Sequence, residues 1–127
     1  MKNSFISNRL KAFIYAFRGA YLLLKTEASI QAQTFIAILT IIAGWYFKIS
    51  ATEWMFQILA IGIVLGTEGM NTAVEKLCDF VHPDYHERIG FIKDVAAGAV
   101  FFVALVAVVI GLFIYIPKIC ILLSTSF

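Results

Sequence analysis

Three long apolar segments separated by short polar ones dominate the pattern of this chain. They cover about residues 30–47, 54–81 and 95–116, and each is long enough to cross the hydrocarbon core of a bilayer as a helix. The third segment is expected to end at Pro117 and Lys118, and residues 82–93 are expected to form a polar connection before it. The pattern therefore predicts an all-α membrane protein with three transmembrane helices.

The segment of about residues 5–26 has an amphipathic pattern instead. Its apolar residues recur at helical spacing and are Ile6, Leu10, Phe13, Ile14, Phe17, Tyr21 and Leu24. Lys11, Arg18 and Lys25 lie on another face of the same helix. This pattern is typical of a surface helix in the headgroup plane, with its basic side toward anionic lipid. A solvated helix in a cytoplasmic bundle is the alternative.

Composition and charge narrow the class of protein. Hydrophobic residues make up 61% of the chain and charged residues 14%, more apolar surface than a soluble domain of 127 residues could cover. Residues 1–127 are therefore expected to form a single membrane domain. The net charge of +2 is too small to indicate a nucleic-acid partner. Lysine and arginine gather before the first span and around the second connection, so the positive-inside rule places both in the cytoplasm.

The second apolar segment carries a polar stripe. At about 100° per residue, Glu68, Asn71, Glu75 and Asp79 fall within roughly an 80° arc of one helix. Glu68 is the deepest of them, and an ionisable group at membrane depth is a candidate functional residue. Pairing with cations on neighbouring helices is the alternative for any one carboxylate. Together, the acidic groups on one face favour a cation site and phosphate chemistry.

Mg²⁺ is usually held by one or two carboxylates together with substrate phosphates. Glu75 and Glu27, which lies at the mouth of the first span, are the expected pair. Glu68 lies about 10 Å deeper than Glu75 at a rise of about 1.5 Å per residue, a depth that suits a base acting on a lipid hydroxyl. The candidates for binding phosphate oxygens are Lys93, Tyr85, His86 and Arg18. The chain has no Walker loop, kinase glycine-rich loop or dinucleotide fingerprint.

The segments GTEGMNTAVEKLCD and HPDYHERIGFIKDVAAGAV resemble those of the small prokaryotic diacylglycerol kinases and the related undecaprenol kinases. The family pattern is E-x-x-N-[ST]-A-x-E-x-x-x-D, then an acidic residue with Tyr-His, then K-D-x-x-[AS]-[AG]-A-V. The matching residues here are Glu68, Asn71, Thr72, Ala73, Glu75 and Asp79, then Asp84, Tyr85 and His86, then Lys93, Asp94 and residues 97–100. The spacing needs no gaps, and the resemblance covers nearly the whole chain.

The resemblance implies a homotrimer in the bacterial inner (cytoplasmic) membrane, with active sites shared between neighbouring subunits at the cytoplasmic face. It implies MgATP as the phosphoryl donor and a lipid hydroxyl as the acceptor. By position, Glu68 resembles the catalytic base, and Glu27 and Glu75 resemble the Mg²⁺ ligands. The positions that match nucleotide contacts are Tyr15, Glu27, Glu75, Asp84, Tyr85, His86, Lys93 and Asp94. Ala97, with Glu68, matches the lipid-substrate position, and Asn71 and Asp79 match supporting polar positions.

Some positions depart from the family pattern or separate its two branches. Asn8 stands where relatives have a basic residue, and Gly69 replaces a bulkier apolar residue. Pro83 and the Pro117-Lys118 ending resemble the undecaprenol kinases, whereas the segment after Glu27 lacks the basic residues often seen there.

The expected activity is transfer of the γ-phosphate of ATP to diacylglycerol, giving phosphatidic acid, or to undecaprenol, giving undecaprenyl phosphate. A small proton- or ion-conducting oligomer with Glu68 as a relay is the main alternative. A non-catalytic membrane scaffold, in which the acidic stripe only pairs helices, is a second alternative.

Overall fold

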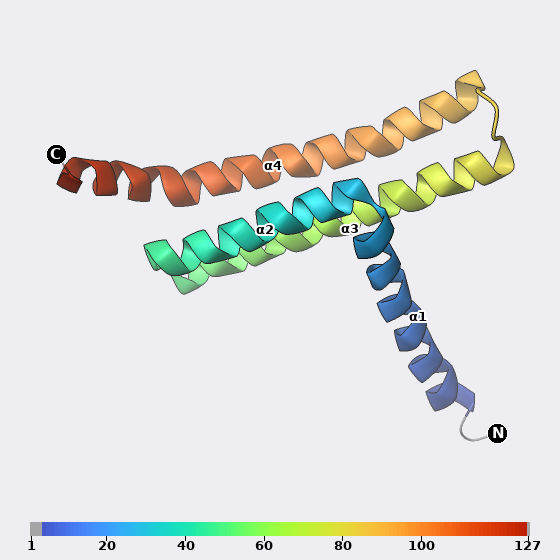
Figure 1. The fold of residues 1–127 in the computed structure, drawn as a ribbon, viewed down its shortest axis with the longest axis horizontal. Coiled ribbons are helices and arrows are strands. Elements are labelled where there is room, and N and C mark those ends of the chain that lie inside the picture. Colours follow the sequence, from blue (N-terminus) through green and yellow to red (C-terminus); the bar gives the residue numbers. More distant parts are fainter. Residues whose placement is uncertain (1–3, 127) are drawn as a thin grey trace.

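The computed structural model describes residues 4–126, which form four α-helices (Figure 1). The helices are α1 (Ser4–Thr26), α2 (Ala28–Phe47), α3 (Ala51–Val81) and α4 (Glu87–Ser126). Helices α2, α3 and α4 are each long and apolar enough to cross a membrane. The prediction of an all-α chain with three candidate spans is confirmed.

Helix α3 is the centre of the arrangement, because it packs along both α2 and α4. Helix α1 leaves the bundle at a steep angle, and α3 continues past the start of α2 (Figure 1). We call the end that carries residues 48–50 the turn end, and the end that carries residues 82–86 the connection end. The candidate site residues of α3 lie toward the connection end.

The turn between α2 and α3 is fixed by local hydrogen bonds. Lys48 adopts a left-handed conformation (φ 52°) and closes α2. Ser50 then starts α3 with a capping box, in which its hydroxyl accepts from Glu53 N–H at 3.1 Å and its own N–H donates to Glu53 Oε1 at 2.9 Å. Gly44 allows the close approach of the two helices, because a Cβ there would lie 2.7 Å from the Trp54 ring.

A polar network joins α2, α3 and α4 in the turn half of the bundle. Gln57, which is 5% exposed, donates from Nε2 to the Thr40 carbonyl at 3.2 Å. The Tyr115 hydroxyl of α4 lies within hydrogen-bonding reach of Gln57 Oε1 and of the same Thr40 carbonyl. Because the hydrocarbon core supplies no water, polar groups at this depth must bind one another. The network therefore stabilises the register of the three helices.

Tyr115→Phe is expected to lower the stability of the bundle by about 1–3 kcal/mol, because Gln57 Oε1 would stay buried without a donor. Thermal unfolding of the detergent-solubilised protein measures the effect. Tyr46→Phe is the matched control, since the Tyr46 side chain is exposed. Equal unfolding temperatures for the two variants would show that the network contributes little.

Two expected boundaries of the last span are wrong. Helix α4 does not end at Pro117 but continues through it to Ser126, and it begins at Glu87, so the connection is residues 82–86 rather than 82–93. A proline removes one helical hydrogen bond, but neighbouring side chains can satisfy the backbone inside a membrane helix. The hydrogen bond that Pro117 removes is the one to the Phe113 carbonyl. Beyond the proline, Lys118 Nζ donates to the Ile114 carbonyl at 3.2 Å and forms an ion pair with Glu53 Oε2 at 2.7 Å, which ties this part of the helix to α3. Lys93 and Asp94 consequently lie on a helix.

Candidate active site

Glu68 lies on the face of α3 that is turned toward the bundle. It is 7% exposed, as are Val64 one turn before it and Thr72 one turn after it. Within residues 4–126, Glu68 forms no hydrogen bond or ion pair with another side chain. A buried carboxylate without a partner is costly, and such groups are common at functional sites. Pairing with a cation of the same chain therefore does not account for Glu68.

Asn71 and Glu75 contact each other one turn closer to the connection end. Asn71 Nδ2 donates to Glu75 Oε1 at 3.2 Å, so the amide holds the carboxylate from the preceding turn of α3. The other amide atom, Asn71 Oδ1, is buried and has no donor in the described part of the chain. A buried acceptor without a donor calls for an explanation, and a ligand or a bound ion is one.

Glu27 lies at the corner where α1 meets α2. It is the residue that precedes α2, with an extended backbone (φ −104°, ψ 116°). Its Oε1 is 3.6 Å from Lys76 Nζ, so its side chain is directed toward α3 at the residue that follows Glu75. The lysine side chain is 71% exposed, and an exposed ion pair of this kind contributes only about 0–1 kcal/mol. A bound cation could therefore take the place of the lysine.

Lys93 and Asp79 form an ion pair across the α3–α4 hairpin. Lys93 Nζ lies 2.6 Å from Asp79 Oδ1, and both side chains are partly exposed. The short connection of residues 82–86 places the first turns of α4 against the end of α3. Asp79 thus holds the lysine that the sequence suggests for phosphate binding, through a contact that incoming phosphate can compete for.

The connection itself carries Asp84, Tyr85 and His86, all of them exposed. His86 Nδ1 accepts the Arg88 N–H at 3.1 Å, which fixes the ring beside the start of α4. His82, to which sequence reasoning assigns no role, donates from Nδ1 to the Asp84 carbonyl at 2.6 Å and lies edge-on to the His86 ring. A histidine in the residues that follow a helix, next to a proline, is a signal for such a turn contact.

Other candidate residues are not brought together by this single chain. Tyr15 lies on α1, which has no buried residue, and Arg18 is exposed on the same helix. Asp94 and Ala97 lie exposed on α4.

The residues present fit a magnesium ion that is completed by phosphate. Within residues 4–126 no group of three or more His, Cys, Asp or Glu side chains is close enough to hold a metal ion. Mg²⁺ does not require such a group, because one or two carboxylates with substrate phosphates suffice. The donors available here are hard oxygens, namely the carboxylates of Glu27 and Glu75 and the unpaired Asn71 Oδ1.

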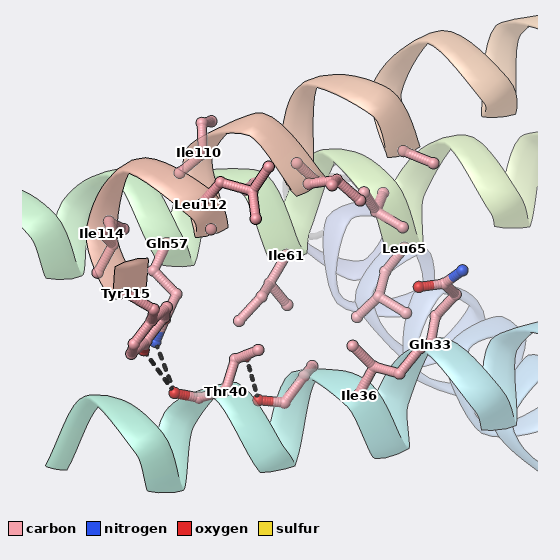
Figure 2. Close-up of a pocket in the computed structure, with 17 residues that line it drawn as sticks. Gln33, Ile36, Thr40, Gln57, Ile61, Leu65, Ile110, Leu112, Ile114 and Tyr115 are labelled. Carbon is pink, nitrogen blue, oxygen red and sulfur yellow. Dashed lines mark hydrogen bonds between the residues drawn. The ribbon is translucent and has the colours of Figure 1, made fainter. Parts of the chain in front are cut away.

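A cavity of about 410 Å³ lies between α2, α3 and α4 (Figure 2). The residues of α3 that line it precede Glu68, toward the turn end. Val64 and Leu65, one turn from Glu68 on α3, line it. Its lining is apolar except for Gln33, Thr40, Gln57 and Tyr115, and the last three belong to the polar network of the turn half. The buried carboxylate therefore lies one helical turn from an apolar space within the bundle.

Comparison with known proteins identifies relatives that match most of the length of this chain. The family model of prokaryotic diacylglycerol kinase matches residues 14–115. The undecaprenol kinase of Bacillus subtilis (strain 168) is 36% identical over 108 residues, which are 85% of this chain and 88% of that protein. The diacylglycerol kinase of Synechocystis is 32% identical over 111 residues, which are 87% of this chain and 63% of that protein. The diacylglycerol kinase of Escherichia coli (strain K12) is 26% identical over 100 residues, which are 79% of this chain and 82% of that protein.

The matched region begins within α1 and ends in α4, so it contains α2, α3 and every candidate site residue named above. The acidic stripe of α3, the connection and the start of α4 therefore fall inside the family's own region. The chain belongs to the prokaryotic diacylglycerol kinase family and is an enzyme of the lipid kinase class.

Proposed function

We propose that the chain transfers the γ-phosphate of ATP, with Mg²⁺, to the hydroxyl of a membrane lipid. The observation that carries the proposal is the buried Glu68 carboxylate, which has no cation partner in the described chain and lies one helical turn from residues that line an apolar cavity. Shallower on the same helix lie Asn71 and Glu75, and Lys93 lies at the connection end. A buried base one helical turn from an apolar space, below acidic and basic groups that suit magnesium and phosphate, matches lipid phosphorylation.

Each residue then has a role in the reaction. Glu68 accepts the proton of the lipid hydroxyl as its oxygen attacks the γ-phosphorus in line. Glu27 and Glu75 hold Mg²⁺, which when bound neutralises charge on the phosphate oxygens. Asn71 keeps the Glu75 carboxylate in place, and Lys93 exchanges its contact with Asp79 for phosphate oxygens. Asp84, Tyr85 and His86 at the connection, Asp94 on α4 and Tyr15 on α1 contact the nucleotide, and Ala97 lies near the lipid.

Undecaprenol is the acceptor we favour over diacylglycerol. The identity to the Bacillus undecaprenol kinase is 36%, compared with 32% and 26% to the two diacylglycerol kinases. Pro83 and the Pro117-Lys118 pair also resemble the undecaprenol branch.

Transfer of ³²P from ATP to the two lipids, measured side by side in detergent with Mg²⁺, tests this proposal. We expect labelled undecaprenyl phosphate to exceed labelled phosphatidic acid. The reverse ratio would reassign the substrate, and absence of label in both lipids would contradict the kinase assignment. Proton flux in proteoliposomes without any transfer would support the alternative of a conducting oligomer with Glu68 as its relay.

The proposal includes a homotrimer in the bacterial inner membrane, with the N-terminus and the connection in the cytoplasm and α1 at the membrane surface. Exposed aromatic and aliphatic side chains along α1 support its contact with lipid. On α3, Gly62 and Gly66 are exposed, and a Cβ at either position would meet nothing within 4 Å. Glycines four residues apart allow a helix of another copy to approach closely.

Gly66→Leu is therefore expected to reduce the trimer fraction, because the added side chain would keep neighbouring copies of α3 apart. Cross-linking in detergent, followed by electrophoresis, measures the oligomeric state. Gly111→Leu is the control, since Gly111 lies on α4 and lines the cavity instead. An undiminished trimer in the Gly66 variant would exclude this face of α3 from the interface.

A further inference from the structure

Two side chains form hydrogen bonds at the corner between α1 and α2. The Thr26 hydroxyl donates to the Leu22 carbonyl at 2.7 Å within α1 and lies 3.4 Å from Glu27 Oε1, whereas Gln31 alone reaches from α2 back to α1. The last carbonyl groups of a helix have no partner within the helix and must be satisfied from outside it. Gln31 Nε2, one turn into α2, donates to the Leu24 carbonyl at 3.0 Å and to the Lys25 carbonyl at 3.2 Å. Its amide therefore reaches back across the corner and binds the end of α1.

Glu27 lies inside the segment that Gln31 closes. The Glu27 N–H donates to the Leu23 carbonyl at 3.0 Å, and the Glu27 carbonyl accepts from Gln31 N–H at 3.0 Å. The Glu27 backbone is therefore hydrogen-bonded on both sides. Its N–H donates to α1, and its carbonyl accepts from the backbone N–H of Gln31. The direction of the Glu27 side chain depends on the angle at which the two helices meet.

A second contact fixes the same corner to α3. Leu23 Cδ1 lies 3.1 Å from the point where Gly69 would carry a Cβ, so the end of α1 packs closely into a notch on α3 at this glycine. Glu27 follows Leu23 by one helical turn, and it meets Lys76, which lies farther along α3 from Gly69. The notch and the Gln31 amide together set where the Glu27 carboxylate meets α3.

We infer that Gln31 is a positioning residue for the metal site: its amide fixes the α1–α2 corner so that the Glu27 carboxylate is held against α3 at Lys76, the residue next to the proposed ligand Glu75. The role of Glu27 as a metal ligand rests on the proposed function. The closure of the corner by Gln31 is independent of that function. Partners of ligand side chains typically change metal affinity when they are replaced, since they orient the ligand.

The test compares four full-length proteins, namely the unaltered chain and three variants of it. Gln31→Leu keeps the approximate size and removes the donors, whereas Gln31→Arg restores donors that can reach the same carbonyls. Gln33→Leu is the matched control, because Gln33 lies two residues farther on and lines the cavity instead of the corner. All are compared with the unaltered chain in the same detergent.

The first readout is hydrogen exchange of the backbone amides in residues 23–31, without metal or nucleotide. Gln31→Leu is expected to accelerate exchange there, and Gln31→Arg and Gln33→Leu are expected to leave it near the level of the unaltered chain. Equal exchange in all four proteins would overturn the closure of the corner. This readout holds whether or not the chain phosphorylates a lipid.

The second readout is binding of Mn²⁺ with a non-hydrolysable ATP analogue, followed by electron paramagnetic resonance. Gln31→Leu is expected to weaken binding by about tenfold, the lower end of the effect of losing a group that orients a ligand. Gln31→Arg is expected to recover most of that loss. Altered exchange with unchanged Mn²⁺ affinity would overturn the link to the metal site, whereas absence of phosphoryl transfer in the unaltered chain would count against the proposed function itself.

Gly69→Leu tests the second contact without touching Gln31. The added side chain should push Leu23 out of the notch and weaken Mn²⁺ binding, and Leu23→Ala in the same protein should relieve the effect by making room. If the double variant binds no better than Gly69→Leu alone, the seat of α1 on α3 does not position Glu27.

Discussion

Glu68→Gln is expected to abolish lipid phosphorylation while the protein stays folded and still binds MgATP. The amide has nearly the size of the carboxylate, so the packing on the buried face of α3 is kept. It cannot accept the proton of the lipid hydroxyl, and loss of a general base typically costs about 10²–10⁴ in rate. Single-turnover transfer of ³²P to undecaprenol measures the loss, and binding of the Mn²⁺ complex of the ATP analogue shows that the nucleotide site remains.

Glu87→Gln is the control for Glu68→Gln. Glu87 is an exposed carboxylate at the start of α4, to which no role in the site is assigned, so its removal should leave the rate unchanged. Comparable rates for Glu68→Gln and Glu87→Gln would remove Glu68 from the role of base. A Glu68 variant that also loses nucleotide binding would indicate a structural role for the carboxylate.

Glu75→Gln is expected to raise the Mg²⁺ concentration needed for half-maximal activity by about 10- to 100-fold. The carboxylate is a proposed ligand, and the Asn71 amide that donates to it would still find an acceptor oxygen in the glutamine, so the local fold should persist. A Mg²⁺ titration of the transfer rate at fixed ATP measures the shift. The rate at saturating Mg²⁺ should fall less than in Glu68→Gln, because the proposed base is intact.

Glu75→Asp serves as the companion to Glu75→Gln. It keeps the charge on a shorter side chain, so its Mg²⁺ requirement should lie between those of the unaltered chain and of the glutamine variant. An unchanged titration in Glu75→Gln would show that Glu75 does not bind the ion.

Much of the fold follows from local pattern alone. The apolar lengths predict α2, α3 and the middle of α4, and the depth of Glu68 within an apolar run accords with its burial. The helical spacing also anticipates the contact between Asn71 and Glu75, which lie one turn apart. These features depend on the period of a single helix, which the sequence displays directly.

The remaining features depend on contacts between helices. The partner of Gln57 is Tyr115, 58 residues away, and that of Asp79 is Lys93, 14 residues away across a connection whose shape no periodicity reveals. The rule that proline ends a helix is wrong for Pro117, because only one helical hydrogen bond is lost there and the ion pair of Lys118 with Glu53 ties the helix beyond the proline to α3. The proposed role of Gln31 cannot be predicted from the sequence, because the partner of a glutamine near the start of α2 depends on the angle between α1 and α2.

The polar network of the turn half has a consequence for how the protein enters the membrane. Helices α2 and α3 emerge from the ribosome before α4, and as a hairpin they satisfy only the Nε2 group of Gln57, through the Thr40 carbonyl. The Gln57 oxygen and the free carboxylate oxygen of Glu53 obtain their donors, Tyr115 and Lys118, only after α4 has been inserted. The inserted hairpin therefore has two acceptors without donors until α4 has been inserted. A chain truncated before Tyr115 would expose an incompletely packed bundle to membrane proteases.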